Sequence, residues 1–104
     1  MNLSITARRF KLSDDLRDYI EEKMQKLTRY HENIINAEVI LGWEKQSRFV
    51  EVILDVSQDK IVVTEKTEDL RKSFDLALDR AERQLKKYKT KFQDKRKEKP
   101  VVNL

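Results

Sequence analysis

The residues best suited to chemistry in this sequence are cations near its C-terminal end. Arg80, Arg83, Lys87 and Lys91 recur at spacings of three and four residues. On a helix this spacing places them in one continuous stripe that extends over about three turns. The stripe favours binding of a lattice of phosphates, because each phosphate that a cation neutralises releases condensed counterions.

The same stripe has an ordinary alternative explanation, which is a solvated helix face with cations near the helix C-terminus. The helix dipole favours such cations, but its effect is confined to the last turn, and the stripe is longer. Residues 80–99 also hold ten Lys and Arg against three Asp and Glu, whereas residues 1–79 hold thirteen against sixteen. Because clustered cations repel one another, this basic end indicates an anionic partner.

A second basic group lies earlier in the chain. Lys23, Lys26 and Arg29 fall in the second half of a segment with helical periodicity. If this segment and the last one pack side by side on a sheet, their basic flanks can line a shared patch.

The aromatic residues add little to this binding surface. Phe10, Tyr30 and Trp43 lie near the ends of predicted elements and can be partly exposed. No predicted strand carries a pair of outward aromatic side chains of the kind that stacks single-stranded bases. We therefore expect recognition of backbone and shape more than of individual bases.

The sequence offers few candidate residues for catalysis. The chain has no cysteine and one histidine, His31, which is most simply a polar residue at a helix end. Adjacent carboxylates such as Asp14 and Asp15 point away from each other on a helix. The single glycine, Gly42, excludes a glycine-rich phosphate loop. The sequence therefore predicts no enzyme activity, no metal site and no cofactor.

Length and composition indicate the number of domains and the cellular compartment. A chain of 104 residues is expected to form one domain. No stretch approaches the roughly 18 apolar residues of a membrane span, and the N-terminus lacks the apolar run of a signal peptide. We expect a cytoplasmic protein with no membrane partner that is a monomer in solution.

Hydrophobic periodicity predicts the elements that position these residues. Alternating apolar residues predict four strands and 3.6-residue periodicity predicts two helices, the first capped by Ser13 and the second by Thr67. The strands are expected at 3–7, 34–42, 48–56 and 60–66, and the helices at 14–30 and 68–92. Within 34–42, Ile35, Ala37, Val39 and Leu41 share one apolar face, and the apolar face of the last helix includes Phe74 and Leu85.

This order, β-α-β-β-β-α, predicts an α+β fold. We expect a two-layer sandwich with two helices on one face of a four-stranded sheet, like the double-stranded-RNA-binding domain. Residues 1–92 would form the domain. Residues 93–104 would be a charged tail, extended around Pro100 and frayed or disordered.

The sequence resembles the ribosome hibernation promoting factor family, also called ribosome-associated inhibitor A or the sigma-54 modulation protein family. The resemblance covers residues 1–92 and is carried by the opening segment 2–30, by AEVILGWEK, by TEDL and by DLALDRAERQLKKYKTK. Two departures are Ala7, where the family usually has glycine, and Arg71, where a tyrosine is common.

The resemblance implies binding to the small ribosomal subunit and its ribosomal RNA, in the channel of messenger and transfer RNA. It also implies inhibition of translation in stationary or stressed cells and protection of idle ribosomes. Family contacts, carried over by position, fall on Arg8, Lys23, Lys26, Arg29, Arg80, Arg83, Lys86, Lys87 and Lys91. Long members carry a second domain that pairs two ribosomes, which is absent from this sequence.

The residues are also compatible with two other functions. A general double-stranded-RNA-binding module would use the same helices and sheet to recognise the shape of an A-form duplex. A membrane-surface or protein-interaction module would use the last helix as a basic amphipathic element. The apolar face of that helix is regular and carries aromatic residues. It therefore favours packing of the helix in a core over a role at a membrane surface or in a protein interaction.

Overall fold

The computed structural model describes the backbone of residues 2–102 and the side chains of residues 2–88. It contains four strands and two helices in the predicted order β-α-β-β-β-α. They are β1 (Asn2–Ala7), α1 (Asp14–Tyr30), β2 (Ile34–Glu44), β3 (Ser47–Val56), β4 (Asp59–Thr67) and α2 (Leu70–Val102).

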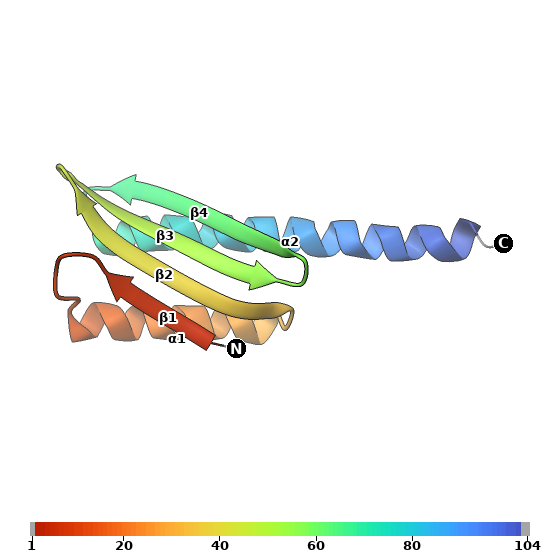
Figure 1. The fold of residues 1–104 in the computed structure, drawn as a ribbon, viewed down its shortest axis with the longest axis horizontal. Helices are drawn as coiled ribbons and strands as arrows, with labels where there is room; N and C mark the ends of the chain where they lie inside the picture. Colours follow the sequence, from red (N-terminus) through yellow and green to blue (C-terminus); the bar gives the residue numbers. More distant parts are fainter. Residues whose placement is uncertain (1, 103–104) are drawn as a thin grey trace.

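The four strands form one mixed sheet in the order β1-β2-β3-β4 (Figure 1). β1 pairs with β2 in parallel, and the other two pairings are antiparallel. A parallel pair needs a crossover connection, which α1 supplies, whereas β2, β3 and β4 follow one another through tight turns. The predicted antiparallel meander over the last three strands is therefore confirmed.

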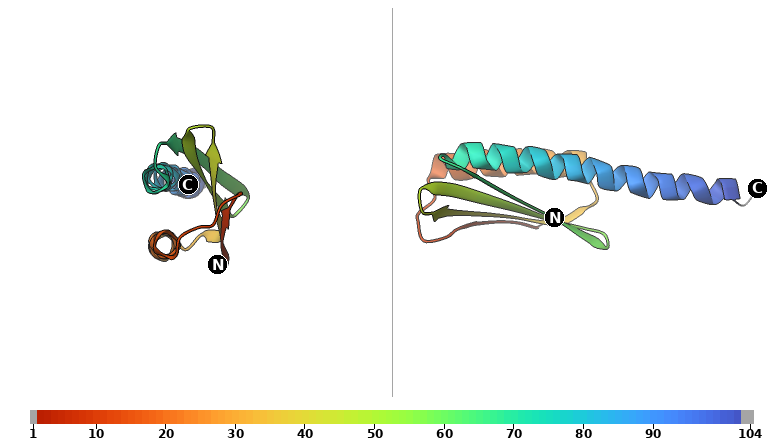
Figure 2. Two further views of the ribbon diagram at one scale, coloured as in Figure 1. Left: turned by 90° about the vertical axis from the view of Figure 1, so that its left-hand side faces the viewer. Right: turned by 90° about the horizontal axis from the view of Figure 1, so that it is seen from above.

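Both helices lie on the same face of the sheet, as the view along the helices shows (Figure 2). The core between the layers holds Ile20 and Met24 from α1, Phe74 and Leu85 from α2, and alternate strand residues such as Val52, all fully buried. The predicted two-layer α+β sandwich is confirmed.

One predicted core position is wrong. Ile35 was expected on the inward face of its strand, but its side chain is 54% exposed and Ile34 is buried instead. The pairing of β2 with β3 shifts between Ile34 and Asn36. Such a bulge changes the phase of the alternation by one residue, so a period-two pattern counted through it assigns the wrong face.

The start of each helix is fixed by a side-chain cap. Ser13 caps α1 as predicted, because its Oγ accepts a hydrogen bond from the Leu16 N–H at 3.2 Å. The expected cap of α2 at Thr67 is wrong by two residues. The side chain of Asp69 accepts the Lys72 N–H at 3.3 Å, and Thr67 instead accepts the Asp69 N–H at 3.0 Å.

The second helix is longer than expected. Its backbone is helical to Val102 and includes Pro100, so the extended conformation predicted around Pro100 is not observed. Residues 89–99 contain no glycine or proline and are rich in Lys, Arg, Gln and Glu, which favour helix. A division between a domain and a tail at residue 92 stays a prediction, since side chains beyond Tyr88 lie outside the described residues.

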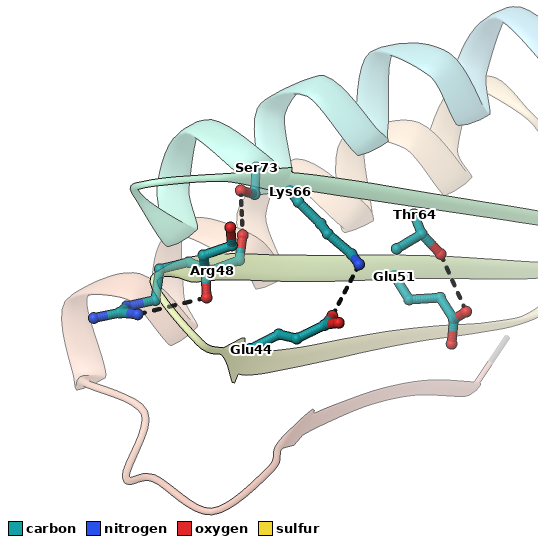
Figure 3. A network of polar contacts seen from close by, with 7 residues as sticks. Glu44, Arg48, Glu51, Thr64, Lys66 and Ser73 are labelled. Atoms are coloured by element: carbon teal, nitrogen blue, oxygen red, sulfur yellow. Dashed lines mark hydrogen bonds and ion pairs between the residues drawn. The ribbon is translucent and has the colours of Figure 1, made fainter.

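The opposite face of the sheet carries no helix and is covered by cross-strand pairs (Figure 3). Glu51 accepts a hydrogen bond from Thr64 at 3.2 Å, and Lys66 pairs with Glu44 at 2.9 Å. Gly42 lies beneath the Phe49 ring, where a Cβ would come within 2.4 Å of ring carbons. This close approach explains why glycine occupies that position.

Three residues other than glycine have positive φ angles, all at connections. They are Arg9 (φ 63°), Lys45 (φ 55°) and Gln58 (φ 65°). Lys45 is the first residue of a two-residue hairpin loop, where a positive φ is typical of a type II′ turn whose twist matches that of the strands, and Gln58 is the second residue of the other two-residue loop. For residues with a Cβ the left-handed region costs about 1 kcal/mol.

Candidate nucleic-acid interface

The predicted cationic stripe lies on the solvent-exposed side of α2. The side chains of Arg80, Arg83 and Lys87 are all exposed, and none takes part in the core. The side chain of Lys91 lies outside the described residues. The helix therefore presents three of the four predicted cations to solvent.

Two of these cations form ion pairs within the protein. Arg80 Nη1 lies 3.3 Å from Glu65 Oε1 on β4, and Arg83 Nη2 lies 2.9 Å from Asp79 Oδ2 one turn earlier on α2. The side chains of Arg80 and Arg83 are 50% and 72% exposed. Exposed pairs of this kind contribute about 0–1 kcal/mol, so a phosphate can replace the carboxylate at little cost.

The cations of α1 border a groove between the helices. Lys23 and Lys26 line it from α1, together with Leu27 and Tyr30, and α2 contributes Leu78 and Glu82. Lys26 and Arg29 are exposed, and Lys23 is half-buried. The groove therefore brings two of the three predicted α1 cations close to α2.

Arg80 lies on a different side of α2 from the cations of α1. Arg80 faces β4 through its pair with Glu65, whereas Glu82 faces α1 through a 3.5 Å contact with the His31 imidazole. The body of α2 thus separates Arg80 from the groove that Lys23 and Lys26 line. Lys86 is exposed and follows Glu82 by one turn, so helical spacing places it between the two sets.

His31 lies at the end of α1, as expected, but it is buried. Its backbone N–H donates to the Leu27 carbonyl, and its side chain contacts Glu82 on α2. This contact links the end of α1 to the middle of α2 and gives His31 a structural role.

A contact that the sequence analysis missed couples the two helices near their starts. The Tyr19 hydroxyl donates to Asp75 Oδ1 at 2.6 Å, and the Arg71 guanidinium lies 4.3 Å from the Tyr19 ring centroid. Lys23 Nζ lies 5.5 Å from the same centroid. The hydrogen bond to Asp75 is the main cause that raises the pKa of Tyr19, and burial adds to it. The only sign of this contact in the sequence was Arg71, at a position where the family commonly has a tyrosine.

Arg8 lies apart from the other predicted contacts. Its backbone N–H donates to the Leu41 carbonyl at 2.8 Å, directly after β1, and its side chain is exposed. This is the end of the sheet where α1 begins, whereas Arg29 lies in the last turn of α1. A helix of 17 residues is about 25 Å long, so Arg8 and Arg29 lie near opposite ends of α1.

Other kinds of site find no support in the part of the chain that the structure describes. Within it, no group of three or more His, Asp or Glu side chains could hold a metal ion. No helix there is both long enough and apolar enough to cross a membrane.

Comparison with known proteins identifies the family. The model of the sigma 54 modulation protein / S30EA ribosomal protein family matches residues 3–93. The chain belongs to this family. A ribosome hibernation promoting factor from Azotobacter vinelandii is 36% identical over 91 residues, which cover 88% of this chain and 85% of that protein. The family is one of hibernation factors and not of enzymes.

Other members of the family differ in length. A ribosome hibernation promoting factor from Pseudomonas putida is 32% identical over 93 residues and is covered to 91% of its length. A ribosome hibernation promotion factor from Deinococcus radiodurans is 35% identical over 100 residues, but this chain covers only 52% of it. The chain therefore matches about half of this longer relative.

Solved structures confirm the fold of the family. A ribosomal subunit interface protein from Coxiella burnetii has a TM-score of 0.81 at 26% identity, covering 86% of this chain and 99% of that one. The N-terminal domain of Protein Y from Thermus thermophilus has a TM-score of 0.75 at 31% identity, with 85% and 99% covered.

Proposed function

We propose that this protein is a ribosome hibernation factor that binds the small ribosomal subunit in the channel of messenger and transfer RNA. Bound there, it blocks translation sterically in stationary or stressed cells and protects the idle ribosome. The observation that carries the proposal is the exposed cationic flank of α2, Arg80, Arg83 and Lys87, in a chain of the hibernation-factor family.

The chemistry of the flank supports binding to a phosphate backbone. Arginine guanidinium groups donate two parallel hydrogen bonds to one phosphate, and a lysine adds a point charge. In the free protein the two guanidinium groups lie beside the carboxylates of Glu65 and Asp79, which phosphate oxygens would replace. Lys23, Lys26 and Arg29 on α1, with Arg8 at the far end and Lys86 and Lys91 on α2, complete the proposed contacts.

Inhibition by occupancy requires no reactive group. A domain that fills the channel excludes messenger and transfer RNA by volume, and its affinity comes from ionic contacts spread over both helices. The protein would act as a monomer in the cytoplasm, with the small subunit and its ribosomal RNA as partners and no cofactor.

Sedimentation with purified small ribosomal subunits over a salt series tests this proposal. Affinity is expected to fall steeply with salt, and Arg83→Gln or Lys87→Gln should each lower the slope of log K against log salt by about one unit. Lys60→Gln is the matched control. It removes the same charge from an exposed lysine that pairs with Asp55 on the sheet, away from the flank. Its slope should equal that of the unchanged protein.

Two results would contradict the proposal. One is an affinity for small subunits that barely changes with salt. The other is unchanged attachment of a variant in which Arg80, Arg83, Lys87 and Lys91 are all glutamine.

A general double-stranded-RNA-binding module is the second candidate, favoured by two helices on one face of a small sheet. Competition separates the two functions. Plain duplex RNA at comparable concentration should displace a general binder from ribosomes, whereas it should leave a ribosome-specific factor bound.

A further inference from the structure

Three side chains form a stack at the end of the molecule where both helices begin. The Phe10 and Trp43 rings lie 5.6 Å apart at an interplanar angle of 17°, and the Arg48 guanidinium carbon lies 4.2 Å from the Trp43 ring centroid. Trp43 nevertheless remains 57% exposed. A large aromatic residue is thus held in a fixed orientation and still offers much of its surface to solvent.

The stack is fixed by backbone contacts on both sides. Trp43 on β2 and Arg48 on β3 are direct partners in the antiparallel register. The connection that carries Phe10 is tied to β2 by the hydrogen bond from the Arg8 N–H to the Leu41 carbonyl. The Arg48 carbonyl accepts a hydrogen bond at 2.7 Å from Ser73, which is buried at the start of α2 (Figure 3).

Trp43 and Arg48 also line a groove between the starts of the two helices. Leu16 of α1 and Leu70 of α2 contribute apolar walls, and Arg71 contributes a second guanidinium group. The rest of the lining is polar and consists of Ser13, Glu68 and Asp69. An apolar floor with planar cations at its edge suits a flat, polarisable ligand.

Cations surround this end of the molecule. Arg9 and Lys11 in the connection after β1 and Lys45 in the β2–β3 loop are exposed, and within the described residues they make no ion pair. Arg9 and Lys45 also have positive φ angles, which cost free energy for residues with a Cβ. Long cationic side chains are thus present at two positions where glycine would be less strained.

Three of the carboxylates nearby lie at the helix starts. Asp14 and Asp15 lie in the first turn of α1, where the dipole favours negative charge. Asp69 accepts the Lys72 N–H at the start of α2. None of these three carboxylates forms an ion pair with Arg9, Lys11 or Lys45. Glu44 pairs with Lys66 and also interacts with the charge of the adjacent Lys45, and Glu68 lines the groove.

We propose that the Phe10–Trp43–Arg48 stack is a second RNA contact that binds an unpaired nucleotide. Bases stack on aromatic rings and on guanidinium planes, and the flanking cations would hold the adjacent phosphates. A base inside a duplex is covered on both faces, so the contact selects unpaired RNA. This departs from the expectation of backbone and shape recognition alone.

The inference deepens the proposed function and rests on it for the identity of the RNA. The stack lies at the opposite end of α1 from Arg29, about 25 Å away along a helix of 17 residues. Two contacts at opposite ends would fix the orientation of the domain on folded RNA, which a single cationic flank does not.

The only tryptophan in the sequence makes the contact directly measurable. Single-stranded RNA of about 12 nucleotides should quench Trp43 fluorescence, and a duplex of equal phosphate concentration should quench it much less. Trp43→Leu should weaken binding to this RNA and to small ribosomal subunits by about tenfold or more, and Trp43→Phe should retain most of the affinity.

Control variants separate this contact from the cationic flank and from loss of folding. Val62→Ala truncates an apolar residue of similar exposure on the open face of the sheet and should bind as the unchanged protein does. Lys45→Gln should weaken binding, whereas Lys60→Gln in the other hairpin should not. Trp43→Phe also shows that the fold tolerates replacement at this position.

Each remaining outcome has a distinct meaning. If Trp43→Leu binds subunits and single-stranded RNA normally while Lys87→Gln weakens binding, the stack is not a contact and the proposed function stands. If the unchanged protein fails to bind small subunits, the proposed function is wrong. In that case the quenching of Trp43 fluorescence by single-stranded RNA decides by itself whether the stack binds RNA. A Trp43 response to anionic vesicles and none to RNA would overturn the RNA contact in favour of a lipid surface.

Discussion

Tyr19 shows how one residue joins the two helices that carry the proposed contacts. Its hydroxyl hydrogen-bonds to Asp75 on α2, and its ring lies beside both Arg71 and Lys23. The hydrogen bond to a carboxylate favours the protonated phenol, so the pKa of Tyr19 lies above its ordinary value of 10.0. A group with a raised pKa stabilises the fold at low pH and loses that effect as pH rises through the folded-state pKa.

The first prediction concerns this side chain. Tyr19→Phe should lower the free energy of unfolding by about 1 kcal/mol at neutral pH, because it removes the hydrogen bond to Asp75. The difference between the two proteins should shrink above pH about 10, because an ionised Tyr19 no longer donates and is repelled by the Asp75 carboxylate. Urea unfolding at a series of pH values measures it. Asp75→Asn should reduce the same alkaline loss, and a difference that is constant across the series would contradict this assignment.

At the scale of the elements, local periodicity predicted most of the fold. The apolar face of α2 was predicted from residues such as Phe74 and Leu85, and both are fully buried. Ile35 was misassigned because a bulge is a property of strand pairing and leaves no local signal. Thr67 was misassigned as a cap because Thr67 and Asp69 are both good capping residues, and only the observed hydrogen bonds distinguish them.

The candidate site was less predictable than the fold. Helical spacing correctly predicted that Arg80, Arg83 and Lys87 share an exposed flank. It could not predict which neighbour that flank faces, because the partner of Arg80 is Glu65 on a different element. The stack of Phe10 on Trp43 joins residues 33 positions apart, and nothing in the local pattern of either residue encodes that contact.

The second prediction concerns the attachment of α2 to the sheet. Ser73 is fully buried, and its hydroxyl is hydrogen-bonded to the Arg48 carbonyl and to Thr67, each at 2.7 Å. Ser73→Ala should lower the free energy of unfolding by about 1–3 kcal/mol, because it removes two hydrogen bonds at a buried position, one of them to the Arg48 carbonyl. Denaturant unfolding measures the loss. Ser57→Ala, an exposed serine in the β3–β4 turn, should change stability little, and equal effects of the two changes would show that the Ser73 contact contributes nothing specific.

At the scale of the whole molecule, charge is divided between two surfaces. The exposed flank of α2 is basic, whereas the open face of the sheet carries Glu44 and Glu51 beside Lys66 (Figure 3). Residues 1–79 contain more acidic than basic residues, so the basic character of the protein arises from its last segment. Such an asymmetric field steers the domain so that the helices, and not the sheet, approach an anionic surface.

The last prediction separates the folded domain from the tail charges. A fragment of residues 1–92 should unfold at nearly the same denaturant concentration as the full chain, because it keeps every core residue in the part of the chain whose side chains are described, including Leu85 and the partly buried Tyr88. Residues 93–104 add four Lys and Arg and two Asp and Glu. If those cations reach phosphates, the fragment should bind small subunits with a smaller dependence on salt, by up to about four units of slope. Replacement of Lys95, Arg96, Lys97 and Lys99 by glutamine in the full chain is the control, since it removes charge and keeps length. A fragment that loses stability would place the domain boundary beyond residue 92. An unchanged slope in both proteins would instead confine the ionic contacts to residues 1–92.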